Sequence, residues 1–415
     1  MDKNSRSLYS EALYFDPQES AVNYPLSDRI NAIQPSPTLA VSQKAAELKA
    51  AGHDVIGLGV GEPDFDTPEF IKTAAKAAID AGHTKYTAVD GIVELKQAVI
   101  DKFQRDNQLH YELPEILISA GGKHSIFNLL SAWLNPGDEV LIPAPYWVSY
   151  PDMAKLVGAE PKFIQAGIEQ RYKITPEQLA AAITPKTRLL FLNSPSNPTG
   201  TAYTKEELAA LADVLREHPQ ILIASDDMYE HILWADFDFA NIAMAAPDLR
   251  DRIVLLSGVS KAYAMTGWRI GYAAGPKPLI AAMKKMQSQS TSNPASISQY
   301  AALAALNGDQ SCIKHMISEF KQRHDYLVEA LNQIPGVRCI EGDGTFYTFA
   351  NIEQMMATKG LQSDVEWCEA LLKNNKVALV PGSAFGAPGH CRLSFATDLA
   401  TLKEAVKRIS DFANN

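Results

Sequence analysis

The chain has 415 residues, 46% of them hydrophobic and 21% charged, a globular composition with room for two or three domains. Its formal net charge of -10 argues against a nucleic-acid or anionic-membrane surface, because such surfaces depend on clustered lysine and arginine. The first 25 residues contain no apolar core segment, so they predict neither a secretory signal nor a membrane span. We expect a cytoplasmic protein.

Helical and strand patterns alternate along the chain without repeats or low-complexity linkers, which predicts an α/β fold. Thr67 and Pro68 begin a predicted helix that runs toward Gly82. Thr204 and Glu207 have the spacing of a capping box ahead of a second helix. Four apolar runs predict strands of one parallel sheet: residues 139–142, 188–192, 220–224 and 252–256.

The last part of the chain has a different pattern, which predicts a smaller second domain. From about residue 290, two long helical patterns precede a mixed region with strand-like runs at 345–349 and 377–380. All four cysteines also lie in this last third and lack Cys-x-x-Cys spacing, so we expect reduced thiols and no metal site: Cys312, Cys339, Cys368 and Cys391. The predicted divisions are an extension or arm over residues 1–25, small-domain segments over 26–65 and 306–415, and a large domain over 66–305.

A glycine-rich loop follows the short apolar strand at residues 116–118 and precedes a helical run at 125–134. Gly121 and Gly122 let backbone amides converge at the start of the helix, where the helix dipole favours an anion. This pattern predicts a phosphate site, and a simple tight bend is the alternative.

Polar and aromatic residues follow the predicted parallel strands. Asn197 follows the strand at residues 188–192, Asp226 and Tyr229 follow the strand at 220–224, and Trp147 follows the strand at 139–142. Because ligands in open α/β sheets bind outside the carboxyl ends of the strands, we expect these side chains to share one site.

Lys261 follows the strand at residues 252–256 and is the most informative residue. Partial desolvation and the nearby Arg269 are expected to lower the pKa of its amine, which can then attack a carbonyl. The pattern therefore predicts a Schiff-base lysine. A surface lysine in a loop is the alternative that this residue alone leaves open.

Together these residues match the requirements of pyridoxal 5′-phosphate. A carboxylate keeps the pyridine nitrogen protonated, an amide and a phenol hold the ring oxygen, and an aromatic side chain stacks on the ring. Singly, each is better explained by structure alone: Asp226 as a helix cap, Trp147 and Tyr229 as core aromatics, and Asn197 as part of a turn. Their occurrence at consecutive strand ends favours the cofactor site.

The sequence resembles class I aminotransferases of fold type I, and among them the bacterial gamma-type aspartate aminotransferases, from about Leu26 to the C-terminus. That resemblance implies a large domain with a mostly parallel sheet covered by helices, and a smaller α/β domain. The segments that carry the resemblance are residues 34–38, 61–68, 145–151, 197–200, 257–272 and 392–396.

By this resemblance, Lys261 forms the Schiff base and carries the proton, and Asp226 pairs with the pyridine nitrogen. Asn197 and Tyr229 hold the ring oxygen, and Trp147 covers the ring. The resemblance further implies phosphate contacts from Gly121, Gly122, Lys123, Ser260 and Arg269. It implies that Arg392, near Gly61, contacts the substrate α-carboxylate. It also implies a homodimer with shared active sites, in which Tyr86 contacts the phosphate in the neighbouring subunit.

The implied reaction transfers the amino group of aspartate to 2-oxoglutarate, giving oxaloacetate and glutamate by a ping-pong mechanism. No arginine occurs at residues 287–293, where other aspartate aminotransferases supply one for the distal carboxylate. Lys123, supported by Ser36 and Thr38, still favours a dicarboxylate. Prephenate-using relatives carry lysine or arginine where this chain has Gln34, so we predict weak prephenate activity; broader or aromatic specificity is the alternative.

Other classes are less well supported. Gly57, Gly59 and Gly61 lack the spacing of a dinucleotide-binding fingerprint. The first 25 residues are too few and too acidic for an appended DNA-binding module. A lyase or racemase on the same fold remains open, because fold does not fix function.

Overall fold

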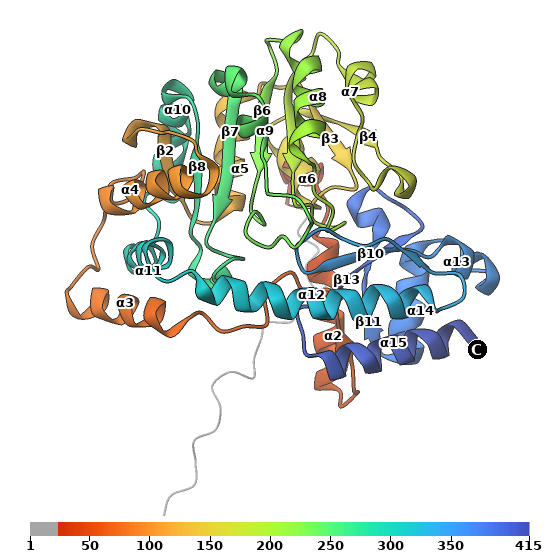
Figure 1. The fold of residues 1–415 in the computed structure, drawn as a ribbon. Coiled ribbons are helices and arrows are strands. Elements are labelled where there is room, and N and C mark those ends of the chain that lie inside the picture. Colours follow the sequence, from red (N-terminus) through yellow and green to blue (C-terminus); the bar gives the residue numbers. More distant parts are fainter. Residues whose placement is uncertain (1–23, 415) are drawn as a thin grey trace, which may run out of the picture.

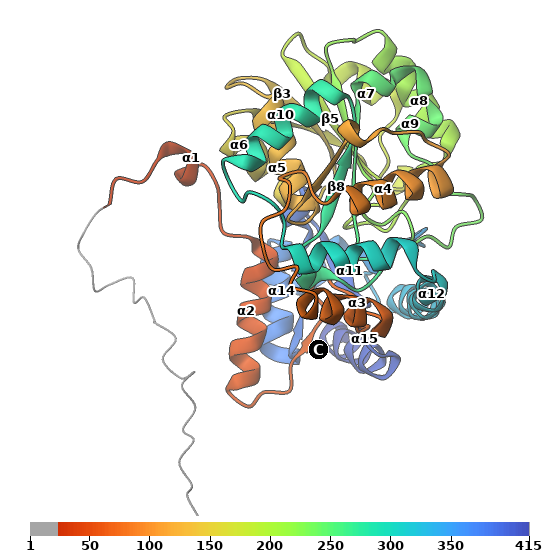
Figure 2. The same cartoon turned by 90° about the vertical axis from the view of Figure 1, so that its left-hand side faces the viewer.

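The computed structural model describes residues 24–414, so the predicted arm over residues 1–25 lies almost entirely outside the described residues. Two parts are visible, a larger one built on a seven-stranded sheet and a smaller one that contains the C-terminal end of the described chain (Figure 1). In Figure 2 the larger part lies above the helices α2 (Pro37–Ala50), α14 (Asp364–Asn375) and α15 (Leu399–Asn414).

The large sheet has the strand order β2-β8-β7-β6-β5-β3-β4. The strands from β7 to β4 pair in parallel, as predicted for the four apolar runs, whereas β8 runs antiparallel to both of its neighbours. Their bounds are β2 Ile116–Ser119, β3 Glu139–Ala144, β4 Glu160–Gln165, β5 Thr187–Asn193, β6 Leu222–Asp226, β7 Ile253–Gly258 and β8 Gly271–Ala274.

Helices cover both faces of this sheet because successive strand residues point to opposite sides. Ile223 belongs to the core on one face, and its neighbours Leu222 and Ala224 belong to the core on the other. The first core includes α3 (Glu69–Asp80), α4 (Val93–Lys102), α7 (Pro176–Ala182), α8 (Lys205–Arg216), α9 (Ile242–Ala245) and α11 (Ser296–Asn307). The second includes α5 (Gly122–Trp133), α6 (Ser149–Leu156) and α10 (Lys277–Ser288).

Two local predictions about these helices are confirmed. The backbone N–H of Glu207 donates to Thr204 Oγ1 at 3.2 Å, and that of Thr204 donates to Glu207 Oε2 at 2.8 Å, which is a capping box at the start of α8. The helix after the glycine-rich loop is α5, which begins at Gly122.

The smaller part has a hydrophobic core of its own, which includes Phe320, Trp367 and Leu402. In this part β1 (Ile56–Gly57) pairs in parallel with β11 (Val377–Ala378), far along the chain. The remaining elements of this part are α12 (Ser311–Asn332), α13 (Glu353–Lys359) and the sheet β12-β13-β10-β9, with β9 Arg338–Cys339, β10 Tyr347–Asn351, β12 Val380–Pro381 and β13 His390–Ser394. The short helix α1 (Asp28–Asn31) extends from α2 toward the large part and contacts α6 (Figure 2). The domain boundaries near residues 65 and 305 stay a prediction.

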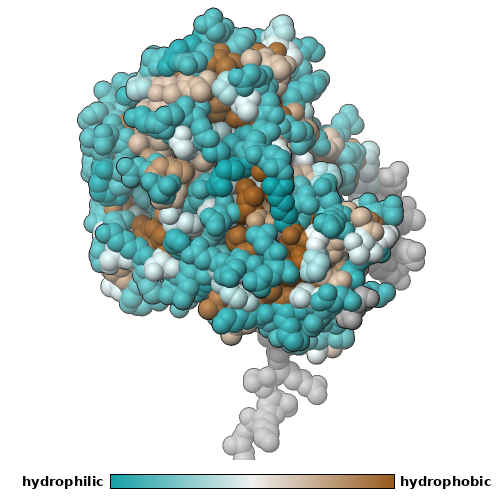
Figure 3. Space-filling view, turned by 45° about the vertical axis from the view of Figure 1, so that its right-hand side comes forward, coloured by the Kyte–Doolittle hydropathy of each residue, from teal (hydrophilic) through white to brown (hydrophobic). Residues whose placement is uncertain are grey.

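The surface is largely hydrophilic, with apolar residues gathered in a central hollow of the face shown in Figure 3. The four cysteines are free thiols, and three of them are buried. Among residues 24–414, no helix combines the length and apolar character that a membrane span requires.

Candidate active site

One pocket brings together most of the predicted site residues. It lies where the loops after β5, β6 and β7 meet the segment after β1 and side chains of β10 and β13. Of the predicted residues, those in its lining are Thr38, Gly61, Gly122, Lys123, Trp147, Asn197, Asp226, Tyr229, Ser260, Lys261, Arg269 and Arg392.

Lys261 lies just beyond β7 and is partly buried. Its Nζ donates to the carbonyl oxygen of Gly61 at 2.5 Å. Burial, followed by the positive charges of Arg392 and Arg269, lowers the pKa of this amine to about 8. The neutral, nucleophilic fraction of this amine near neutral pH is therefore much larger than that of an ordinary lysine. The predicted effect of Arg269 is present, and the structure adds a larger one from Arg392.

Asp226 is the last residue of β6 and is buried. Its Oδ2 accepts a hydrogen bond from the Tyr150 hydroxyl at 2.6 Å, and its Oδ1 accepts one from the Met228 N–H at 3.3 Å. Burial raises the pKa of this carboxyl to about 6, although both hydrogen bonds and Lys261 oppose the shift. A buried carboxylate in this position favours a cationic or N–H ligand.

Arg392, on β13, is a buried guanidinium, 3% exposed. It donates to Asn197 Oδ1 at 2.8 Å and to the Gly59 carbonyl at 2.7 Å, and its Nε has no hydrogen-bond partner. None of the acidic side chains in the described part of the chain pairs with it. A buried cation without a counter-ion is costly, and a carboxylate ligand would complete its fork of donors.

The predicted phosphate loop lies at the N-terminus of α5. Gly121 has φ 91°, and a Cβ there would lie 2.3 Å from a terminal guanidinium nitrogen of Arg269, so only glycine allows this close approach. Arg269 donates to the Thr266 carbonyl at 2.8 Å. Lys123 Nζ lies 5.0 Å from the centre of the Trp147 ring. Backbone amides, a helix N-terminus and a guanidinium therefore converge on one anion-sized space.

Three predicted residues do not line the pocket. Gly121 lies behind it against Arg269, and Ser36 contacts it indirectly, because its hydroxyl lies 2.9 Å from that of Thr38. Tyr86 is 91% exposed in the loop between α3 and α4. Such exposure is compatible with a contact to another subunit, which stays a prediction.

Three polar residues around the pocket are absent from the sequence prediction. Tyr150 holds Asp226, and its position three residues after Trp147 in an aromatic helical turn is the only signal it gives. The Tyr347 hydroxyl lies 3.1 Å from that of Tyr229. Asn193 Nδ2 donates to the Asp226 carbonyl at 2.8 Å, and its Oδ1 accepts from the Asn197 N–H at 2.9 Å.

A mostly parallel α/β sheet with a partly buried lysine, a buried aspartate and an anion site at its strand ends defines an enzyme that processes carbonyl and amino groups. Comparison with known proteins is more specific. Residues 53–409 match the family "Aminotransferase class I and II". The chain therefore belongs to this family, and it is an enzyme with transaminase activity on the fold-type I architecture.

Several relatives are similar over nearly their whole length. An aspartate/prephenate aminotransferase of Nitrosomonas europaea is 58% identical over 93% of this chain and 98% of its own. An aspartate aminotransferase of Geobacillus stearothermophilus is 50% identical over 93% of this chain and 98% of its own. The crystal structure of the aspartate aminotransferase from Rhizobium meliloti has a TM-score of 0.91 at 47% identity, covering 94% and 99% of the two chains. That of Thermus thermophilus with maleate has a TM-score of 0.88 at 40% identity, covering 94% and 100%.

Proposed function

We propose that this enzyme is a pyridoxal-phosphate-dependent aspartate aminotransferase that passes an amino group from aspartate to 2-oxoglutarate in ping-pong fashion. The observation that carries the proposal is the shared pocket of Lys261, Asp226 and Arg392, in which a nucleophilic amine, a buried carboxylate and an unpaired guanidinium face one space. The names of the relatives support the same reaction.

The residues present fit pyridoxal phosphate. Asp226 would hold the protonated pyridine nitrogen, because its buried carboxylate lacks a cationic partner in contact. Asn197 has its Oδ1 occupied by Arg392, which leaves its amide nitrogen, together with the Tyr229 hydroxyl, for the ring oxygen. Trp147 would cover the ring. The phosphate would be held by Gly121, Gly122, Lys123, Ser260 and Arg269.

When bound, the cofactor supplies a carbonyl for the amine and an electron sink for the substrate. The chain's own contribution is proton transfer at one atom, Lys261 Nζ. This amine would accept the α-proton of the substrate and then donate it to a different carbon atom, which completes a 1,3-shift. A pKa of about 8 suits both directions, because the amine is readily protonated and deprotonated near neutral pH. The Gly61 carbonyl lies within hydrogen-bond distance of this atom and orients it.

The charges in the pocket favour a dicarboxylate substrate. Arg392 would bind the α-carboxylate through its fork of donors. Lys123, with Thr38 and the neighbouring Ser36 hydroxyl, would bind the distal carboxylate. Burial, followed by the charge of Arg269, lowers the pKa of Lys123. A carboxylate beside this lysine would offset both effects by stabilising its charged form. The solved structure of the Thermus thermophilus relative is one with maleate, which is also a dicarboxylate.

Prephenate transamination is a second candidate. Two relatives, from Nitrosomonas europaea and Cereibacter sphaeroides, are named aspartate/prephenate aminotransferases at 58% and 55% identity. Gln34 predicts weak activity on this substrate. The kcat/KM for oxaloacetate and for prephenate, measured with one amino donor, decides the matter. A ratio near one overturns the prediction from Gln34, whereas a preference for oxaloacetate of about a hundredfold or more supports it.

We also propose a cytoplasmic homodimer in which the exposed Tyr86 of each subunit reaches the other subunit's cofactor phosphate. The experiment that tests the whole function uses purified apoprotein, pyridoxal phosphate, aspartate and 2-oxoglutarate. We expect continuous formation of oxaloacetate only when the oxo acid and the cofactor are both present, and at most one equivalent of oxaloacetate per bound cofactor when the oxo acid is left out, as ping-pong transfer requires. Release of ammonia or racemised aspartate without an oxo acid would contradict a transaminase and favour a lyase or racemase.

A further inference from the structure

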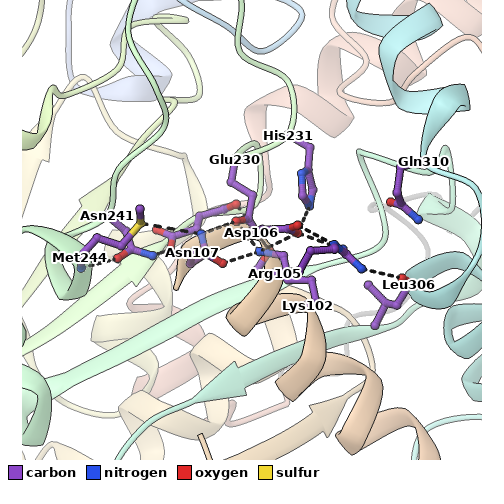
Figure 4. Close-up of polar contacts among 12 residues, drawn as sticks. Lys102, Arg105, Asp106, Asn107, Glu230, His231, Asn241, Met244, Leu306 and Gln310 are labelled. Atoms are coloured by element: carbon purple, nitrogen blue, oxygen red, sulfur yellow. Dashed lines mark hydrogen bonds and ion pairs between the residues drawn. The ribbon is translucent and has the colours of Figure 1, made fainter. Parts of the chain in front are cut away.

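A buried polar cluster lies behind the turn that carries Asp226 and Tyr229, on the side away from the pocket. Figure 4 shows part of it, with Lys102 and Asn107 beside Glu230. We call it the Glu230 network and define it as Lys102, Asn107, Ser225, Asp227, Glu230, Asn241 and Ser257. None of these residues lines the pocket.

The turn itself separates two pairs of side chains. The Glu230 N–H donates to the Asp227 carbonyl at 2.9 Å, a three-residue closure that places residues three apart on the same side. Asp226 and Tyr229 line the pocket. Asp227 and Glu230 are buried on the other side, 1% and 6% exposed. Contacts that hold Asp227 and Glu230 in place therefore also hold Asp226 and Tyr229.

Both carboxylate oxygens of Glu230 are fixed by hydrogen bonds. Its Oε2 accepts from Lys102 Nζ at 2.5 Å and from Asn107 Nδ2 at 3.1 Å. Its Oε1 accepts from the hydroxyl of Ser257 at 3.1 Å. Ser257 lies on β7, the strand that leads to Lys261, so this one side chain ties the Asp226 turn to the strand that presents the lysine.

Lys102 and Asn107, which donate to Glu230, are themselves held in place. Lys102 ends α4 and is 0% exposed, and its Nζ also donates to Asn107 Oδ1 at 2.7 Å. Asn107 ends the π-helical turn Phe103–Asn107, an insertion that often marks a functional position in a helix. Although burial opposes ionisation, the charge of Lys102 holds the pKa of Glu230 below its usual value.

Asp227 completes the network without a cation in direct contact. It accepts hydrogen bonds from the Ser225 hydroxyl at 2.7 Å and from Asn241 Nδ2 at 2.8 Å. Burial, followed by the charge of Glu230, raises its pKa well above the ordinary range. The charged pair within the network is Lys102 with Glu230, and Lys102 Nζ also lies 3.7 Å from Asp106 Oδ2, just outside it.

We propose that Glu230, held by Lys102, is a positioning residue of the cofactor site that keeps the Asp226 carboxylate and the Tyr229 hydroxyl directed at the pyridine ring. This inference rests on the proposed function, because it concerns how that site binds pyridoxal phosphate. It assigns the ion pair a role beyond stability, since a hydrophobic pair of similar volume would fill the same space.

The test uses four full-length variants: Glu230→Gln, Lys102→Met, the double variant Lys102→Met/Glu230→Gln, and Lys173→Met as a control. Lys173 forms an ion pair of the same length with Glu207, at 2.5 Å and away from the pocket lining, although this pair is more exposed than Lys102 with Glu230. For each variant we would measure Tm, the Kd of pyridoxal phosphate well below Tm, the visible absorption of the bound cofactor, and amide exchange of residues 225–231 in the apoprotein.

We expect both single network variants to lose stability, and the double variant to recover it because no unpaired buried charge is left. All folded network variants should still bind the cofactor about tenfold more weakly, with altered absorption and faster exchange at residues 225–231. The control should lower Tm alone. A double variant with wild-type Tm, Kd, absorption and exchange would overturn the inference.

The outcomes separate the two proposals. If the wild-type protein fails to bind pyridoxal phosphate, the proposed function is wrong, and exchange in the apoprotein still shows whether Glu230 holds the turn. If the wild type binds the cofactor and every folded network variant binds it equally well, the function stands and only the positioning role of Glu230 is wrong.

Discussion

Lys102 and Arg392 are buried cations on opposite sides of the ends of the parallel strands, and they differ in their partners. Lys102, 0% exposed, is paired with Glu230 and bonded to Asn107. Arg392, 3% exposed, has two neutral acceptors, no pairing carboxylate among the described residues and a free Nε. The comparison teaches that the two buried charges are compensated differently: Lys102 by a carboxylate of the chain itself, and Arg392, on the proposed function, by the carboxylate of a bound substrate.

The largest effect tests the ligand side. Lys261→Ala removes the amine that the function requires, so the visible absorption of the bound cofactor and transamination should disappear together, with a loss in kcat of at least about 10⁴-fold. The absorption in question is the band of the Schiff base between the cofactor and Lys261, because cofactor bound without that bond still absorbs as the aldehyde. Absorption spectra and steady-state rates check this. Lys123→Met, which removes another cation of the same pocket but leaves the amine, should keep the absorption. Wild-type turnover by Lys261→Ala would contradict the assignment.

Removing the paired cation should cost stability. Lys102→Met leaves Glu230 buried without its partner, so the free energy of unfolding should fall by about 3–5 kcal/mol. Chemical denaturation of the apoprotein measures this. An unchanged denaturation midpoint would contradict the comparison, because it would show that the ion pair of Lys102 with Glu230 does not stabilise the fold.

Removing the unpaired cation should give the opposite pattern. Arg392→Leu eliminates a buried charge without a counter-ion, so apoprotein stability should stay constant or rise. The kcat/KM for aspartate should fall by about 10²–10³-fold, since the substrate carboxylate loses a charge-assisted pair of bonds. The same denaturation and kinetic measurements apply. A fall in stability as large as that of Lys102→Met would show that the two cations do not differ.

The pH dependence of stability sharpens the contrast. The pKa of Lys261 is about 8 in the folded apoprotein, below its ordinary value of 10.5. Between these two values the unfolded chain binds a proton that the folded chain lacks, so stability rises with pH across this window. Compared with Lys261→Ala, the wild-type apoprotein should gain about 1–2 kcal/mol from pH 7.5 to pH 10.5, allowing for partial exposure. A flat difference would contradict the lowered pKa.

The smallest effect concerns a hydrogen bond. Tyr150→Phe removes the 2.6 Å bond to Asp226, so the carboxylate should ionise less readily and bind the cofactor about fivefold more weakly, a change of ~1 kcal/mol. Tyr203→Phe provides a control, because the hydroxyl of this buried tyrosine of the large part contacts the Ile174 N–H and not the pocket. Equal cofactor affinity in both variants would remove Tyr150 from the site.

The sequence was sufficient to predict the parallel strands and the side chains at their ends, because strand patterns and the residues that follow them are local. It predicted β6 two residues too early, since the apolar Ile221 continues the hydrophobic run toward Gln220 although both residues lie outside the strand. The four cysteines are free, as expected from their spacing.

Pairing between distant segments could not be predicted in the same way. Arg392 and Asn197 were both identified by motif, yet their mutual hydrogen bond joins residues 195 apart. Tyr347 and Glu230 give no local signal, because a tyrosine in a strand and a glutamate in a turn have many ordinary explanations. Their roles depend on what tertiary folding places beside them.

The pairing of β1 with β11 has a consequence for how the protein is made. The first strand of the smaller part has no partner until Val377 and Ala378 have been synthesised, whereas the seven strands of the large sheet are complete by Ala274. Domains fold as units while the ribosome is still elongating the chain. The nascent polypeptide therefore completes the sheet that carries Asp226 and leads to Lys261 first, and Arg392 arrives last, so a product that ends early would lack the guanidinium that we propose binds the substrate carboxylate.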